Sequence, residues 1–266
     1  KNGQKVYSVQ TGLNLSGIDL GSNSVYAVQQ PKVILVVGTG VNASEAGEIW
    51  NLFDHQLGMP VTKVSMEQFG RVNLHGYNTL ILPSGNYGAL GESQVNHLKD
   101  WVNRGGTIIS MKTASLWLNQ KGIIKEELVS NEGEKSPASL PFARRNDTEG
   151  AKEVGGSIYL AELDLTHPIA YGYSRKTLPV YRNTDIFVKP SADKYLTPIR
   201  YTANPHLGGY ISKAKLESLK QSASVVISPS GQGRVVHFID SPNFRGAWYG
   251  TNKLFFNALF HGNAMN

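Results

Sequence analysis

One short segment of the sequence has the residue types and the setting of a nucleophile turn. Residues 107–110 (TIIS) form an apolar run that predicts a buried strand, and residues 111–115 (MKTAS) follow it directly. In α/β hydrolases the nucleophile lies on a sharp strand-to-helix turn flanked by small residues. Lys112 or Thr113 would occupy the tip of this turn, and Ser115 follows closely. These three residues are therefore candidate catalytic residues.

An amine or a hydroxyl at that tip needs an adjacent base to act as a nucleophile. His167 and His237 are the histidines that folding could bring near it. The alternative is a turn that keeps the shape of a nucleophile site without its chemistry. We favour this second interpretation and keep the first as an alternative.

Two further segments supply candidate binding residues. Ser84 and Gly85 end a neighbouring apolar run, so a backbone amide there could point into the same crevice, although Ser84 lacks the glycine pattern that flanks a nucleophilic serine. Near the end of the chain, residues 243–252 form an aromatic and polar cluster that contains Arg245, Trp248 and Tyr249. Such a cluster could stack against a sugar or a peptide. The alternative is that it docks the final helix.

Nucleotide and metal sites are not supported. Residues 38–40 (GTG) resemble part of a dinucleotide fingerprint, but position 43 is Ala and the nearest ribose-binding acid is Glu67, three residues past the next strand. The chain contains 7 histidines, and no two lie at an H-x-x-H or H-x-x-E spacing. With no cysteine, the chain has no disulfide, zinc-thiolate site or cysteine nucleophile.

Composition narrows the class of protein. The 266 residues are 40% hydrophobic and 17% charged, which is enough to bury a core. The net charge is +6, but the 26 lysines and arginines are scattered and no nucleic-acid motif accompanies them. No apolar run is long enough for a membrane helix. We therefore expect neither a nucleic-acid partner nor a membrane span.

The order of predicted elements indicates a doubly wound sheet. Apolar runs at 33–37, 61–64, 79–83 and 107–110 alternate with amphipathic helical segments at 43–57 and 91–103. Short connections between them indicate parallel strands and right-handed crossovers. A flavodoxin-like α/β sheet is therefore expected over residues 31–120.

The remainder of the chain predicts β insertions in the same domain. Residues 130–156 are polar and rich in Gly, Pro and Ser, which indicates a long surface loop. Strand-like runs follow, with a hairpin expected at 224–239 and a final helix at 250–260. We interpret residues 1–30 as an extended lead-in from a preceding domain, and residues 31–266 as one α/β domain. The chain starts at Lys1 without a signal-peptide pattern, so we expect it to be processed or cut from a larger protein.

Four stretches together resemble a known protein family. They lie at 7–33 (including GIDLGS and QPKV), 45–62 (EAGEIW and GMPVT), 165–173 (LTHPIAYGY) and 243–253 (NFR and WYGTNK). They resemble the C-terminal region of large secreted bacterial zinc carboxypeptidases, which are carboxypeptidase A-like metallopeptidases. The resemblance spans nearly the whole chain. It implies a class I glutamine amidotransferase-like domain that follows the catalytic domain.

The resemblance carries over no catalytic residue. The family holds its zinc with an H-x-x-E pair and a later histidine in the peptidase domain, and that pattern does not occur here. An amidotransferase triad needs Cys, His and Glu, with the cysteine at the turn where Lys112 or Thr113 stands. His167-Pro168 is similar to the His-Pro of that triad, but Ile169 stands where Glu would follow.

The interpretation that follows is a non-catalytic accessory domain of a zinc carboxypeptidase. It would brace the N-terminal peptidase domain of the same polypeptide or present substrate, with Trp248 and Tyr249 as a candidate contact. The resemblance implies zinc in that peptidase domain, no cofactor in this chain, and a periplasmic or extracellular location. The alternative is a stand-alone hydrolase, or a glycan- or peptide-binding module, that uses the crevice at the carboxyl ends of the strands.

Overall fold

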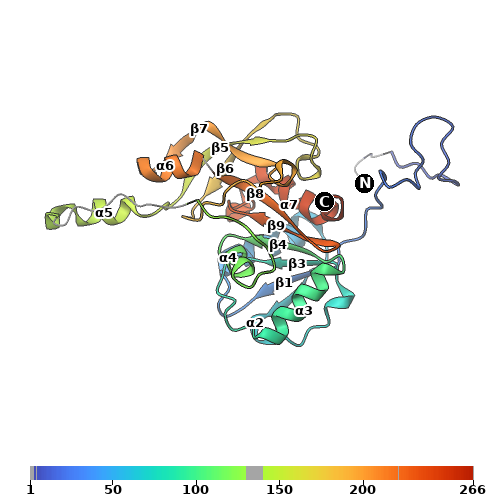
Figure 1. The fold of residues 1–266 in the computed structure, drawn as a ribbon, viewed down its shortest axis with the longest axis horizontal. Helices are drawn as coiled ribbons and strands as arrows, with labels where there is room; N and C mark the ends of the chain where they lie inside the picture. Colours follow the sequence, from blue (N-terminus) through green and yellow to red (C-terminus); the bar gives the residue numbers. More distant parts are fainter. Residues whose placement is uncertain (1–2, 4, 130–139, 221, 266) are drawn as a thin grey trace.

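A single mixed sheet organises the molecule in the computed structural model, which describes residues 3, 5–129, 140–220 and 222–265. The sheet has nine strands in the order β2-β1-β3-β4-β9-β8-β7-β5-β6 (Figure 1). The flavodoxin-like α/β fold expected from the alternating pattern is therefore confirmed.

The first half of the sheet is parallel. Its strands are β1 (Val33–Val37), β2 (Thr62–Ser65), β3 (Thr79–Leu82), β4 (Thr107–Met111) and β9 (Gly233–Phe238). Its helices are α1 (Ala43–Asn51, continued by η1, Leu52–Leu57), α2 (Met66–Phe69), α3 (Glu92–Asn103) and α4 (Thr113–Gln120). Strands β1, β3 and β4 are almost wholly buried, which is why their sequences are continuous apolar runs.

The second half is antiparallel and begins where β8 (Ala223–Ser230) pairs with β9. The strands β7 (Ile199–Gly209), β5 (Ser157–Leu163) and β6 (Thr177–Arg182) extend it. Its helices are α5 (Arg145–Ala151), α6 (Lys213–Lys220) and the C-terminal α7 (Tyr249–His261). Short helical turns lie at η2 (Leu74–Gly76), η3 (Phe142–Arg144), η4 (Pro168–Ala170), η5 (Lys194–Leu196), η6 (Phe244–Gly246) and η7 (Gly262–Ala264).

Helices cover both faces of the parallel half. Residues of α1, η1 and α7 pack in one apolar cluster against one face, and residues of α2, α3 and α4 pack in a second cluster against the other. The parallel strands therefore lie between two helical layers. No helix in the described part of the chain is long and apolar enough to cross a membrane.

The antiparallel half curls back onto the end of the parallel half. The backbone amide of Ser241, just past β9, donates to the carbonyl of Tyr181 in β6 at 3.1 Å. Strands β9 and β6 are separated by three others in the sheet order, so this bond needs strong twist and coiling. The curl brings the residue after β6 over the carboxyl end of β4.

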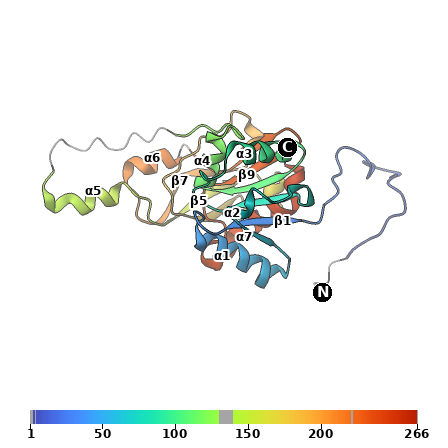
Figure 2. The same cartoon turned by 90° about the horizontal axis from the view of Figure 1, so that it is seen from below.

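One predicted segment differs from the structure. The polar stretch at 130–156 contains the helices η3 and α5, whose residues are mostly exposed, so polarity there reflects a solvated helix rather than a loop alone. Residues 130–139 lie outside the described part. The described residues before β1, which were expected to be extended, form no helix or strand, and most of them lie apart from the sheet in both views (Figures 1 and 2). The last few return to the domain, because the carbonyls of Ala27 and Gln30 accept bonds from the side chains of Asn263 and Asn78.

Candidate functional site

Lys112 occupies the tip of the turn between β4 and α4. Its backbone has φ 47° and ψ −113°, a conformation with positive φ that a non-glycine residue rarely adopts. The turn is held from both sides, because the Lys112 amide donates to the Phe238 carbonyl at 3.0 Å and the Ser115 amide donates to the Lys112 carbonyl at 3.1 Å. A residue in such a conformation costs about 1–3 kcal/mol, and these bonds hold it in place.

The side chain of Lys112 turns into the protein and is held by two oxygens. Its Nζ donates to Glu45 Oε1 at 2.6 Å and to Asn183 Oδ1 at 2.6 Å, and the residue is only 5% exposed. Glu45 lies in the first turn of α1, which Asn42 caps through a bond from the Glu45 amide at 3.1 Å. The ammonium group is thus part of a buried ion pair rather than open to a substrate.

The Glu45 carboxylate lies between the turn after β4 and the loop after β3, the place that we call the crevice. While Oε1 pairs with Lys112, Oε2 accepts a bond from the Ser84 amide at 2.8 Å. The hydrogen of the Ser84 amide, a candidate binding group, is thus already taken by a protein carboxylate. A substrate oxyanion would have to displace Glu45 to use that amide.

Thr113 carries the exposed hydroxyl of the turn, and it bonds to the loop after β3. Its Oγ1 lies 2.7 Å from Ser84 Oγ and accepts from the Gly85 amide at 2.8 Å. It also donates to the Gly85 carbonyl, at 3.1 Å. These contacts join the ends of β3 and β4, and within the described residues no base is among the hydrogen-bond partners of this hydroxyl, so the geometry supports a structural role for Thr113.

The other candidate catalytic residues lie elsewhere. Ser115 is fully buried, and its Oγ lies 2.5 Å from Ser110 Oγ. His237 is also fully buried and its Nδ1 lies 2.7 Å from Glu126 Oε2. His167 caps η4, where Nδ1 accepts from the Ile169 amide at 3.1 Å, and burial lowers its pKa below the ordinary value. Neither histidine hydrogen-bonds to Lys112 or Thr113 in the described structure.

A buried polar network fixes the residues on the far side of the crevice. Arg182 Nη1 donates to the Tyr201 hydroxyl at 2.9 Å, and that hydroxyl donates to Asp240 Oδ1 at 2.5 Å. Arg182 and Asp240 also form an ion pair at 3.6 Å, and burial raises the pKa of Asp240. The network immediately precedes Asn183 and Ser241 in sequence, and Ser241 Oγ donates to Asn183 Oδ1 at 3.3 Å. It therefore holds the Asn183 amide in position against Lys112.

The C-terminal aromatic cluster packs mainly against the protein. The ring of Phe244 stacks on Tyr181 with centroids 3.5 Å apart, and the Arg245 amide donates to Glu48 Oε1 of α1 at 2.7 Å. Trp248 Nε1 donates to the Pro179 carbonyl at 3.3 Å, while Tyr249 is 68% exposed. Docking of η6 and α7 onto α1 and β6 thus accounts for much of the cluster, while Arg245 and Tyr249 remain exposed.

The glycine turn after β1 packs against the loop after β3. A Cβ at Gly85 would lie 2.6 Å from the Gly40 carbonyl oxygen, and one at Gly40 would lie 2.9 Å from the Asn86 carbonyl oxygen. Glycine is required here because two backbones meet, which explains the motif without a phosphate. The described residues contain no group of three or more His, Cys, Asp or Glu side chains placed to hold a metal.

Sequence reasoning missed two residues of the crevice. The residue pattern singles out neither Glu45 nor Asn183 as a site residue. The signal for Glu45 was present, because the first turn of α1 and the turn after β4 meet at the same edge of a parallel sheet. Asn183 had no such signal, because it arrives through the curl of the antiparallel half.

Comparison with known proteins gives the fold. No protein-family model matches the sequence, and no curated protein is detectably similar to it. A solved GMP synthase-like protein from Thermoplasma acidophilum superposes with a TM-score of 0.53 at 12% identity, covering 89% of this chain and 96% of that chain. A ThuA-like protein from Bacteroides uniformis gives 0.50 at 11% identity, covering 90% and 94%.

A second ThuA-like protein, from Parabacteroides merdae, also superposes with a TM-score of 0.50, at 13% identity and with 84% of this chain and 90% of that chain covered. At such low identities these likenesses concern the backbone arrangement and not the chemistry. They extend over most of the sheet and the helices that cover it, as the covered shares of the chain indicate. The chain thus has a class I glutamine amidotransferase-like fold.

Proposed function

We propose that this chain is a non-catalytic accessory domain whose nucleophile turn has become an internal clamp. One observation carries the proposal: the Lys112 ammonium is buried in an ion pair with Glu45 at the tip of the turn. An amine nucleophile must be accessible to its substrate, and this amine is buried against a carboxylate at 2.6 Å. The same carboxylate occupies the amide that would stabilise an oxyanion.

The partner that we propose is the zinc carboxypeptidase domain of a larger polypeptide, in the periplasm or outside the cell. The sequence resemblance supports it, with zinc bound in the peptidase domain and none in this chain. Exposed apolar side chains before β1 are consistent with a covered segment, since Val6, Tyr7 and Leu15 are 90%, 80% and 102% exposed. Tyr249, on the surface of α7, is a second candidate contact.

A turnover assay tests the non-catalytic part. The chain is incubated with glutamine and with a panel of ester and peptide substrates, beside the Lys112→Ala/Thr113→Ala variant. We expect no turnover above the rate of the variant. The alternative, a hydrolase that uses this crevice, predicts turnover that disappears in the variant while its circular dichroism is unchanged, and that result would overturn the proposal.

The size of the native polypeptide tests the proposed partner. An antibody raised against this chain is used on the source cells and on their periplasmic and secreted fractions. We expect a band far above 29.0 kDa that co-purifies with zinc-dependent carboxypeptidase activity. A band of 29.0 kDa without that activity would contradict the carboxypeptidase parent and leave the fold assignment unchanged.

A further inference from the structure

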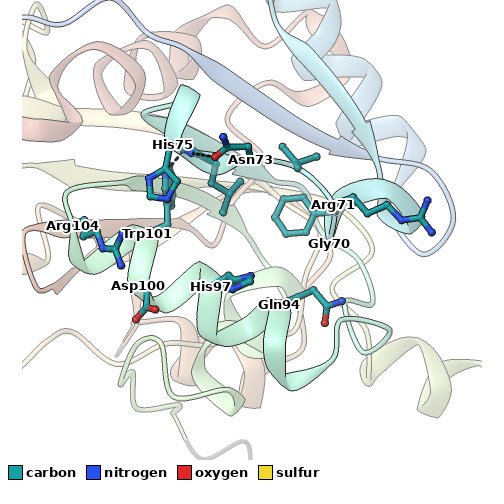
Figure 3. Close-up of a pocket in the computed structure, with 12 residues that line it drawn as sticks. Gly70, Arg71, Asn73, His75, Gln94, His97, Asp100, Trp101 and Arg104 are labelled. Atoms are coloured by element: carbon teal, nitrogen blue, oxygen red, sulfur yellow. Dashed lines mark hydrogen bonds between the residues drawn. The ribbon is translucent and has the colours of Figure 1, made fainter.

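A pocket on the outer side of α3 lies apart from the crevice at Lys112. Its walls are the segment from α2 through η2 and the facing stripe of α3 (Figure 3). The cavity has a volume of about 350 Å³, which is at the small end of the range for sites that bind small molecules. None of the crevice residues lines it.

The floor of the pocket is apolar and rigid. Trp101 of α3 forms it together with Phe69, Val72 and Leu74. The indole Nε1 donates to the Leu74 carbonyl at 3.0 Å and to the Tyr77 carbonyl at 3.3 Å, so two backbone contacts fix the ring. A preformed apolar floor lowers the entropic cost of ligand binding.

Two histidines and an arginine at the edge of this floor have no side-chain partner among the described residues. His75, His97 and Arg104 are exposed, and no ion pair or side-chain hydrogen bond joins them to any described residue. In Figure 3 His75 and Arg104 lie beside Trp101, while the guanidinium of Arg71 points away from the others. Asp100 is the single carboxylate in the lining.

This combination of groups matches an organic anion with an apolar body. An arginine guanidinium presents paired donors that fit a carboxylate, and imidazole rings add further donors. The apolar floor would take up the rest of the ligand, away from water.

We propose that this pocket binds a small organic carboxylate with an apolar or aromatic body. Its carboxylate pairs with Arg104 and His75, and its body lies over Leu74 and Trp101. The site is independent of the proposed accessory role, since it shares no residue with the crevice or with the exposed segment before β1. Recognition there is by charge and shape, without a covalent step.

Isothermal titration with phenylacetate tests the proposal, with tryptophan fluorescence as a second signal. For a ligand of this size we expect a Kd on the order of 1 mM. The uncharged isostere phenylacetamide should bind about tenfold more weakly, because it loses the charge-assisted bonds. Raising the salt concentration should weaken phenylacetate binding.

Two substitutions test whether phenylacetate binds in this pocket. Each removes one positive charge from the region of α3. Arg104→Gln should weaken phenylacetate binding about tenfold or more. Lys99→Gln is the matched control, because Lys99 faces Gly122 on another side of the helix, and it should change the affinity less than about twofold. His75→Gln should give a loss between the two. The urea midpoint of each variant shows that it is folded.

Four outcomes would overturn the proposal. The first is no saturation up to roughly ten times the expected Kd. The second is equal affinity for phenylacetate and phenylacetamide, which would mean that charge is not recognised. The third is equal weakening by Arg104→Gln and Lys99→Gln, which would mean that the anion binds to the general positive field. Equal binding of inorganic phosphate would likewise contradict a role for the apolar floor.

Discussion

The positive charges of the crevice at Lys112 and of the pocket on α3 differ in their burial and in their partners. Lys112 is buried, and protein oxygens from Glu45 and Asn183 satisfy its ammonium. Arg104 is exposed beside a rigid apolar floor, and the described protein offers it no partner. The position where related folds do chemistry is closed by internal contacts, whereas an ordinary helix face is open. Position in a fold is therefore a weaker guide to function than whether the polar groups are already satisfied.

Removing the charge of Lys112 is the most severe test of this contrast. Lys112→Met leaves the Glu45 carboxylate buried without its cation, and we expect the free energy of unfolding to fall by about 3–5 kcal/mol. Urea denaturation followed by circular dichroism measures it. The double variant Lys112→Met/Glu45→Gln should recover a large part of the loss, because no charge is then stranded. A stable single variant would show that the crevice is not a clamp.

Asn183→Ala tests the second acceptor of the same ammonium group. A charged donor then lacks one of its two partners, and because Asn183 is itself exposed and water can replace it, the expected loss is about 0.5–1.5 kcal/mol of unfolding free energy. Asn96→Ala, an exposed position on α3, is the control and should have little effect. Equal urea midpoints for the two variants would mean that Asn183 does not hold Lys112 in solution.

The pH dependence of stability tests the assignment of His167 as a structural cap. Burial lowers its pKa, so the unfolded chain takes up a proton more readily than the folded one. His167 therefore contributes stability above about pH 6.5 that is lost as the pH falls through and below that value. His167→Asn keeps a capping acceptor and should flatten this part of the profile, measured as urea midpoints at about pH 7.5 and 5.5. An unchanged slope would contradict the assignment.

The pocket on α3 should give the smallest effect on stability. Arg104 has no partner within the described protein, so Arg104→Gln should change the free energy of unfolding by less than about 0.5 kcal/mol. The same urea denaturation as for Lys112→Met makes the two regions directly comparable. A loss comparable to that of Lys112→Met would remove the difference between a clamp and an open site.

Local sequence pattern predicted the parallel half of the fold well. The apolar runs at 33–37 and 107–110 became buried strands because such runs can be covered on both faces only in a sheet between two helical layers. The sharp turn at Lys112 followed from the strand-to-helix junction. Its partners did not, since Asn183 lies 71 residues away and reaches the ammonium only through the curl of β6.

The aromatic cluster near the C-terminus illustrates the same limit. Its composition is as compatible with stacking on a ligand as with packing against the protein itself. Only the three-dimensional contacts distinguish these two roles. The ring of Phe244 stacks on Tyr181. The Arg245 amide donates a hydrogen bond to Glu48, which lies on α1 almost two hundred residues away. Burial by such distant elements leaves no trace in the local residue pattern.

The sheet order also has a consequence for how the chain is made. Strand β9 lies between β4 and β8, so the open edge of β4 stays unpaired until residues 233–238 have left the ribosome. Until then the parallel half presents a bare apolar edge to which other strands can add. At a synthesis rate of about 5–20 residues per second, that interval lasts for several seconds. The nascent chain is therefore most prone to aggregation just before its last strand is complete.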